Sequence, residues 1–170
     1  RKVRQGAQVV VVVSAMGKST DALIETSCQA CGGLCLNADL DEVVAMGERI
    51  SATVFSAALK AQRIRCCFLD PSHPNWPIVT NDDFGNADPI LTTCNELVKK
   101  HVQPLLKKGL TVVVPGFIGR TMDGRMTTMG RGGSDITALV LAQALRADLV
   151  LLVTDVEGIL TADPKVIRNP

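Results

Sequence analysis

A glycine-rich segment at residues 127–135 (TTMGRGGSD) runs directly into a periodic apolar stretch at residues 136–145, so three glycines precede a predicted helix. Glycines let the backbone approach a ligand closely, and the unpaired N–H groups at a helix start attract anions. Arg131, Ser134 and Asp135 add a cation, a hydroxyl and a carboxylate at the same place. A simple turn needs fewer of these residues. The segment therefore predicts a ligand-binding loop at the start of a helix.

A second polar loop follows the apolar run at residues 150–153, which is typical of a buried strand. The loop has the sequence TDVEG at residues 154–158. Ligands of open α/β sheets bind in the crevice outside the carboxyl ends of the strands. Two polar loops, one after a strand and one before a helix, favour such a crevice.

The whole chain alternates between short β-branched runs and longer helical patterns. We expect strands at residues 8–13, 63–69, 110–114 and 149–153. We expect helices that begin at residue 21 and cover residues 39–60, 91–108, with a kink or break at Pro104, and 136–145. Residues 70–89 are rich in Pro, Asn and Asp and predict an irregular excursion with at most a short strand near Ile78 and Val79. This order predicts an α/β sandwich with a mainly parallel sheet.

Composition excludes several function classes. The net charge of +1 comes from 18 basic and 17 acidic residues that are interspersed, and aromatic residues make up 3% of the chain, so we expect no nucleic-acid partner. The longest apolar run, residues 9–13, is far shorter than the ~20 residues that span a bilayer. No secretion signal is recognisable, so we expect a cytoplasmic protein without a membrane partner, and 170 residues fit one domain.

Six cysteines raise the question of a metal site. Cys28, Cys31 and Cys35 could supply three ligands, but no nearby Cys or His offers the fourth that closed structural sites normally have. We therefore predict no metal site and expect free, reduced thiols.

Residues 17–19 (GKS) look like the end of a phosphate-binding Walker A loop. That motif needs a glycine five positions before Gly17, where the chain has Val12 inside a predicted strand. The missing glycine argues against a P-loop ATPase. Lys18 is then either a solvated loop lysine or a phosphate contact.

Six sequence blocks, in order, resemble those of the aspartate kinases, within the amino-acid kinase family. They are VVVVVSAMGKST at 9–20, MGERIS at 46–51, FGNA at 84–87, VPGFIG at 114–119, TTMGRGGSD at 127–135 and TDVEGILTADPK at 154–165. The resemblance covers nearly the whole chain, and GRGGSD separates aspartate kinases from uridylate, glutamate and acetylglutamate kinases. It implies a three-layer α/β/α sandwich of the carbamate kinase type, truncated at both ends.

The resemblance implies that the complete protein transfers the γ-phosphoryl group of ATP to the β-carboxylate of L-aspartate. The product is 4-phospho-L-aspartate, and the step is the first in lysine, threonine and methionine biosynthesis. It also implies Mg²⁺ as cofactor and a homo-oligomer. A carboxylate is already a nucleophile at neutral pH, so the protein must mainly hold two anions in line and neutralise charge. Two alternatives stay open: another amino-acid kinase, or a non-catalytic regulatory module.

Site residues follow from the matching blocks. The resemblance implies that substrate is bound by Ser14, Thr20, Glu48, Arg131, Gly132, Gly133 and Ser134. Glu48 suits the α-ammonium, whereas its structural alternative is a surface pair with Arg49 or Lys60. Asp135 is the predicted catalytic residue, which orients a lysine or reaches Mg²⁺; alternatively it is a first-turn acid that favours the helix dipole.

The nucleotide is assigned to Thr154, Asp155, Leu160 and Lys165. Thr154 and Asp155 also suit a turn that closes a strand. The usual family pattern is GIYTADPR, so Leu160 stands where a tyrosine is common and Lys165 where an arginine is common. Lys165 can meet a phosphate only as a point charge, and the stacking contact of a tyrosine is lost.

The chain ends also differ from the family pattern. Family members begin with a lysine-bearing KFGGTS strand and loop, whereas Arg1 falls within the helix that follows it. Pro170 precedes the rest of the nucleotide lobe and the regulatory ACT domains. We therefore expect residues 1–170 to be part of a catalytic domain, without an ACT domain and inactive in isolation.

Overall fold

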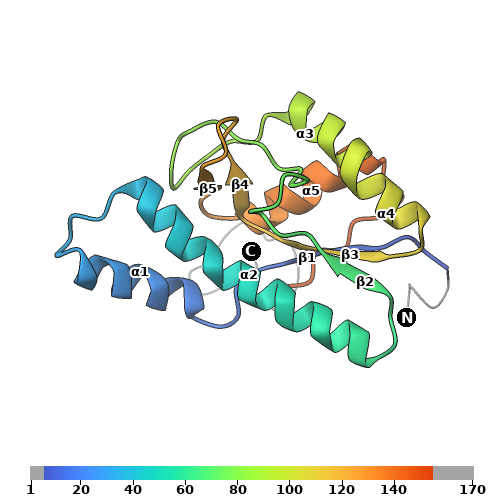
Figure 1. The fold of residues 1–170 in the computed structure, drawn as a ribbon, viewed down its shortest axis with the longest axis horizontal. Coiled ribbons are helices and arrows are strands. Elements are labelled where there is room, and N and C mark those ends of the chain that lie inside the picture. Colours follow the sequence, from blue (N-terminus) through green and yellow to red (C-terminus); the bar gives the residue numbers. More distant parts are fainter. Residues whose placement is uncertain (1–5, 155–170) are drawn as a thin grey trace, which may run out of the picture.

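The computed structural model describes residues 6–154, and a three-stranded parallel sheet lies at its centre (Figure 1). Its strands are β1 (Val10–Val13), β2 (Cys66–Phe68) and β3 (Thr111–Pro115), in the spatial order β1-β3-β2. All five residues of the central strand β3 are buried. A strand covered on both faces has no polar side, which explains why these runs are almost continuously apolar.

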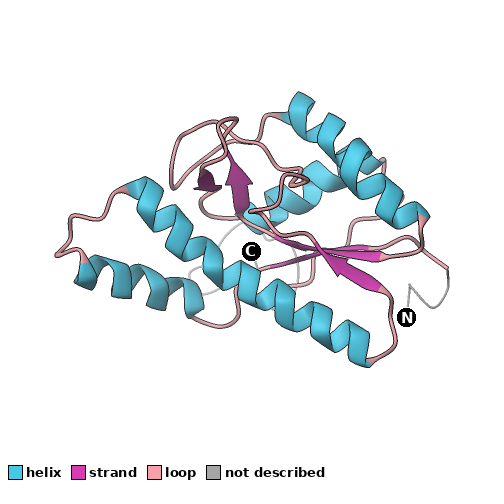
Figure 2. Cartoon of the chain, in the orientation of Figure 1, coloured by secondary structure: helices cyan, strands magenta, loops and turns pink. Residues whose placement is uncertain are grey.

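Helices cover both faces of this sheet, as Figure 2 shows. Helix α2 (Asn37–Ala61) packs on one face, where the Cys66 thiol donates to the carbonyl of Ser56 in α2 at 3.4 Å. Helices α3 (Leu91–Leu97), α4 (Gln103–Lys107) and α5 (Gly133–Leu145) cover the other face, and α1 (Ser19–Ala30) packs along α2. The predicted three-layer α/β/α sandwich is confirmed.

Pro104 interrupts the long helical run, as its sequence predicts. A π-helical turn at Val98–Val102 separates α3 from α4, and Pro104 lies in the first turn of α4. Proline has no N–H to donate, and its ring crowds the carbonyl four residues earlier. The helix widens at this point instead of ending.

The predicted strand at residues 149–153 is wrong. The structure has no strand there, and the five apolar side chains are between 39% and 97% exposed. An apolar run forms a strand only when a neighbour pairs with its N–H and C=O groups, and no described strand does so here.

A short hairpin after β3 was not predicted. Strands β4 (Ile118–Arg120) and β5 (Met126–Thr128) pair antiparallel, and Val79 forms an isolated bridge to Arg120. The short strand expected near Val79 is thus present as single bridges. Each hairpin strand has three residues, too few for a clear alternation. The hairpin leads from the end of β3 to the glycine-rich segment.

The six cysteines are free thiols, and Cys66 and Cys67 lie half-buried in β2. Within residues 6–154, no three His, Cys, Asp or Glu side chains gather in an arrangement that could hold a metal ion. None of the helices in the described part of the chain is long and apolar enough to cross a membrane.

Candidate functional site

A cleft of about 270 Å³ opens beside the carboxyl ends of β1 and β3. Its lining comes from four parts of the chain: Ser14 and Thr20, Glu48, Phe117, and Gly130, Gly132, Gly133, Ser134 and Asp135. The carboxyl ends of adjacent parallel strands meet at one edge of a sheet, which is where α/β proteins bind ligands. The structure therefore brings together seven of the residues that the sequence assigned to the substrate or to catalysis.

Two glycines let the walls of this cleft come close. A Cβ at Gly47 would lie 3.1 Å from the Cβ of Ala15, so α2 packs tightly against the loop after β1. A Cβ at Gly116 would lie 2.7 Å from the Cβ of Ser134, so the end of β3 lies directly against the start of α5. The distance at Gly116 leaves no room for a side chain, and at Gly47 the neighbour would have to shift by a few tenths of an ångström, so glycine permits both approaches.

Glu48 forms the acidic wall of the cleft and is 4% exposed. The N–H of Ala15 donates to its Oε1 at 3.2 Å, whereas its Oε2 is buried without a hydrogen-bond partner among the described residues. The surface-pair alternative is wrong, because Glu48 is buried and Arg49 pairs with Asp70 at 3.1 Å. A buried polar atom normally has a partner, so an unpartnered carboxylate oxygen in a cleft suits a cationic ligand group.

The start of α5 lines the same cleft with hydrogen-bond donors. Gly132 caps the helix in the left-handed region, with φ of 80°. The N–H of Gly133 donates to the carbonyl of Gly130 at 3.1 Å, and Gly133 itself lines the cleft, so its role in substrate binding stays a prediction. The N–H groups of Gly132 and Ser134 have no acceptor among residues 6–154. Together with the helix dipole, these two groups favour an anion at this end of the cleft.

Phe117 and Thr137 belong to the site although sequence reasoning missed them. Phe117 lines the cleft with a left-handed backbone, with φ of 67°. Its N–H donates to Thr137 Oγ1 at 3.1 Å, and the Thr137 hydroxyl donates to the carbonyl of Gly133 at 2.9 Å. Thr137 is fully buried. The only sequence signal was a threonine four residues after Gly133 in an apolar helix.

We expect Thr137→Val to lower the free energy of unfolding of the full-length protein by about 1–3 kcal/mol, because the N–H of Phe117 loses its acceptor. Urea unfolding measures this change. Thr53→Val is the matched control, since Thr53 is an exposed helical threonine that bonds only to its own helix. Surface substitutions of this kind usually stay within about 0.5 kcal/mol. Equal effects of the two variants would contradict the assigned role of Thr137.

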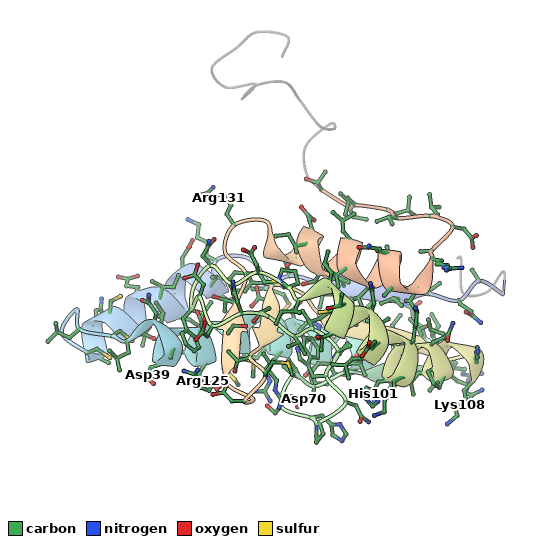
Figure 3. The ribbon with its side chains drawn as sticks, turned by 90° about the horizontal axis from the view of Figure 1, so that it is seen from above. Asp39, Asp70, His101, Lys108, Arg125 and Arg131 are labelled. Carbon is green, nitrogen blue, oxygen red and sulfur yellow. The ribbon has the colours of Figure 1, made fainter. Side chains whose placement is uncertain are left out.

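Two of the predicted site residues that the structure describes, Arg131 and Thr154, do not line the cleft. Arg131 is exposed, and Figure 3 shows its side chain extending outward from the tip of the glycine-rich loop. Thr154 is exposed and is the last residue described. Asp155, Leu160 and Lys165 lie outside the described residues. The roles assigned to these five residues stay predictions.

Burial also makes Glu48 sensitive to pH. Desolvation raises the pKa of Glu48 above its ordinary value of 4.5, against smaller lowering by the N–H groups of Ala15 and Glu48 itself. The folded protein then binds this proton more tightly than the unfolded chain does. The corresponding stability is present below pH 4.5 and is lost as the pH rises through the higher folded-state pKa.

Glu48→Gln should remove the pH-dependent loss of stability that the Glu48 carboxylate causes. Without ligand, the free energy of unfolding of the variant, relative to wild type, should increase as the pH rises above 4.5 and through the raised folded-state pKa of Glu48. Urea titrations at several pH values measure the difference between the two proteins, which cancels the contribution of other carboxylates. A difference that does not change with pH would mean that burial imposes no cost on the Glu48 charge.

Comparison with known proteins gives consistent matches. The family model described as the amino acid kinase family matches residues 1–170. The aspartokinase of Mycobacterium tuberculosis is 40% identical over 167 residues, which cover 98% of this chain and 38% of the relative. Among solved structures, E. coli aspartokinase III with lysine and aspartate has a TM-score of 0.81 at 29% identity, over 98% of this chain and 47% of that one. The same enzyme with aspartate and ADP has a TM-score of 0.74 at 38% identity, over 88% of this chain and 33% of that one.

Proposed function

This chain belongs to the amino acid kinase family, and we propose that the protein containing it is an aspartate kinase, which transfers the γ-phosphoryl group of ATP to the β-carboxylate of L-aspartate. The observation that carries the proposal is that an acidic group and hydrogen-bond donors line one cleft. Glu48 offers an unpartnered carboxylate oxygen, and the start of α5 offers the N–H groups of Gly132 and Ser134. An amino acid with an ammonium group and carboxylates complements these groups. The complex of E. coli aspartokinase III with aspartate and ADP supports the choice of ligands.

In the proposed complex the α-ammonium group of aspartate binds the Glu48 carboxylate. The ammonium group then supplies the hydrogen bonds that this buried carboxylate cannot make to water. The carboxylates of the substrate lie toward the hydroxyls of Ser14, Thr20 and Ser134 and the N–H groups at the start of α5. Arg131, on the same loop, then closes over a substrate carboxylate with its two-pronged guanidinium group. These contacts hold the substrate and leave its β-carboxylate to react.

The chemical step needs positioning more than acid–base help. A β-carboxylate oxygen of aspartate attacks the γ-phosphorus of ATP, a new O–P bond forms, and ADP leaves with the electrons of the broken bond. No proton has to be removed from the nucleophile. The N–H donors and hydroxyls at the start of α5 hold the attacking carboxylate in line with the phosphoryl group, since they are already oriented.

The described residues fit Mg²⁺ only as a partner of bound phosphates. Mg²⁺ commonly binds through one or two carboxylates together with substrate phosphates. Asp135 supplies one exposed carboxylate at the cleft, next to the hydroxyl of Ser134. Asp135 would therefore hold a nucleotide-bound Mg²⁺, which would neutralise charge on the phosphates.

Several properties of the whole protein are part of the same proposal. The chain spans 38% of the length of the M. tuberculosis relative. We infer that residues 1–170 are part of the catalytic domain, that the complete protein is a homo-oligomer, and that Thr154, Asp155, Leu160 and Lys165 contact ATP. The proposed step supplies 4-phospho-L-aspartate for lysine, threonine and methionine biosynthesis.

Arg131→Ala in the full-length protein should raise the KM for aspartate by about ten- to a hundredfold, as expected for a lost hydrogen bond to a charged group. The KM for ATP should change little. Steady-state kinetics with each substrate varied in turn measure both values. Arg65→Ala is the control, since Arg65 is exposed just before β2 and lines a hollow other than the cleft. An unchanged KM for aspartate would remove Arg131 from the substrate site.

The decisive experiment measures ADP release by the full-length protein with ATP, Mg²⁺ and, separately, L-aspartate, L-glutamate and UMP. We expect turnover with L-aspartate far above the other two. Preference for glutamate or UMP would make the protein another amino-acid kinase. Binding of aspartate without ADP release would support a non-catalytic regulatory module.

A further inference from the structure

Helix α2 carries a second buried carboxylate, Asp41, seven residues before Glu48. Seven residues make almost two helical turns, so the two side chains share one face of α2, about 10 Å apart along its axis. Asp41 is 3% exposed and Glu48 is 4% exposed. The Oε2 atom of Glu48 has no hydrogen-bond partner among the described residues, whereas both carboxylate oxygens of Asp41 accept hydrogen bonds from other segments of the chain.

Three hydrogen bonds end on the Asp41 carboxylate. The hydroxyl of Thr128 donates to Oδ1 at 2.7 Å, the N–H of Thr128 donates to Oδ2 at 2.8 Å, and the N–H of Gly85 donates to Oδ2 at 2.9 Å. The ion pairs formed by the described residues do not include Asp41. Asp41 therefore joins α2 to the end of β5, which α2 passes in Figure 1, and to the turn at residues 84–87.

These contacts continue into the wall of the cleft. The N–H of Ala87 donates to the carbonyl of Thr128 at 2.9 Å, which locks the turn to β5. Two residues after Thr128, Gly130 packs so closely on Asn86 that a Cβ would lie 2.7 Å from Asn86 Oδ1. Gly130 lines the cleft. The glycine-rich segment is thus held to α2 through one buried carboxylate.

We propose that Asp41 is a positioning residue that sets the separation between Glu48 and the glycine-rich segment, and thereby the length of the amino acid that the cleft accepts. The inference rests on the proposed function, in which Glu48 binds the ammonium group and the start of α5 faces the carboxylates. A substrate with one more methylene group needs a larger separation. Two hydrogen bonds from Thr128 and one from Gly85 end on the Asp41 carboxylate, so moving the glycine-rich segment away from α2 to lengthen the cleft would break the bonds to Thr128.

Two adjacent threonines of β5 provide a matched test. Thr128→Val removes the hydroxyl that donates to Asp41, whereas Thr127→Val removes a buried hydroxyl that bonds to Thr80 at 2.6 Å. Both threonines are buried, and both substitutions nearly preserve shape. Asp41→Asn tests the same hydrogen bonds by changing the acceptor residue, since it keeps the size of the side chain and removes one acceptor oxygen.

In the full-length protein, Thr128→Val and Asp41→Asn should raise the KM for aspartate about tenfold or more, since small misplacements in such sites cost up to about a hundredfold. The KM for ATP should stay within about twofold, because the ATP contacts proposed for Thr154, Asp155, Leu160 and Lys165 belong to another part of the chain. The ratio of kcat/KM for L-aspartate to kcat/KM for L-glutamate should fall. Thr127→Val should lower the Tm and leave these kinetic values unchanged.

Equal kinetic effects of Thr127→Val and Thr128→Val, or an unchanged aspartate-to-glutamate ratio in Thr128→Val, would overturn the inference. Absence of aspartate turnover in the wild type would instead overturn the proposed function. In that case hydrogen exchange tests whether Asp41 holds the glycine-rich segment. The backbone amides of residues 128–133 should exchange faster in Thr128→Val than in Thr127→Val. Equal exchange in the two variants would overturn the role of Asp41.

Discussion

Glu48→Gln in the full-length protein should raise the KM for aspartate by about thirtyfold or more, because loss of one partner of a buried charged contact costs about 2–5 kcal/mol and 1.4 kcal/mol is a factor of ten. The side chain keeps its shape, and its amide oxygen can still accept from the N–H of Ala15. The folded protein without ligand should be at least as stable as wild type, since a buried charge is removed. Steady-state kinetics and thermal unfolding measure the two effects.

Glu42→Gln is the matched control for this variant. Glu42 lies on the same helix and is exposed, so its charge is solvated and loss of the charge should change neither kinetics nor Tm appreciably. If Glu48→Gln lowered the Tm sharply while the KM for aspartate held, Glu48 would be a structural residue. The unpartnered Oε2 of Glu48 would then need an explanation other than substrate binding.

Gly116→Ala should disrupt both stability and substrate binding. The added methyl group would lie 2.7 Å from the Cβ and 2.8 Å from the Cα of Ser134, and the backbone at the start of α5 cannot move aside without moving the cleft wall. Overpacking of this kind costs about 1–3 kcal/mol of unfolding free energy. A displacement of about 1 Å in a substrate site can cost on the order of a hundredfold in rate. Urea unfolding and kcat/KM for aspartate measure the two losses.

Gly124→Ala separates these two effects. Gly124 lies in the turn of the β4–β5 hairpin with φ of 96°, so alanine is strained there, but the residue does not line the cleft. This variant should lose stability and keep the wild-type KM for aspartate. A Gly116→Ala protein with normal kcat/KM would show that the start of α5 tolerates displacement, which would weaken the proposed role of its N–H groups.

The local patterns of the chain predicted most of its elements. The β-branched runs at β1, β2 and β3 and the helical periodicities of α2 and α5 are properties of neighbouring residues, and the structure confirms them. The interruption of the helix near Pro104 is also local, because proline lacks an N–H wherever it occurs. The prediction of a strand at residues 149–153 was wrong for a related reason. The composition of this run suits a strand, but a strand also needs a pairing partner, which local composition does not specify.

The sequence by itself determined the residue types of the candidate site, since the glycine-rich segment and Glu48 can be read from residues and family resemblance. Only the tertiary structure decided that Glu48 is buried with a free oxygen, that Phe117 adopts a left-handed backbone, and that Asp41 holds the glycine-rich segment. Asp41 and Thr128 are 87 residues apart in the chain. Hydrogen bonds across such separations depend on how the helices and strands pack, and no local pattern of side chains encodes them.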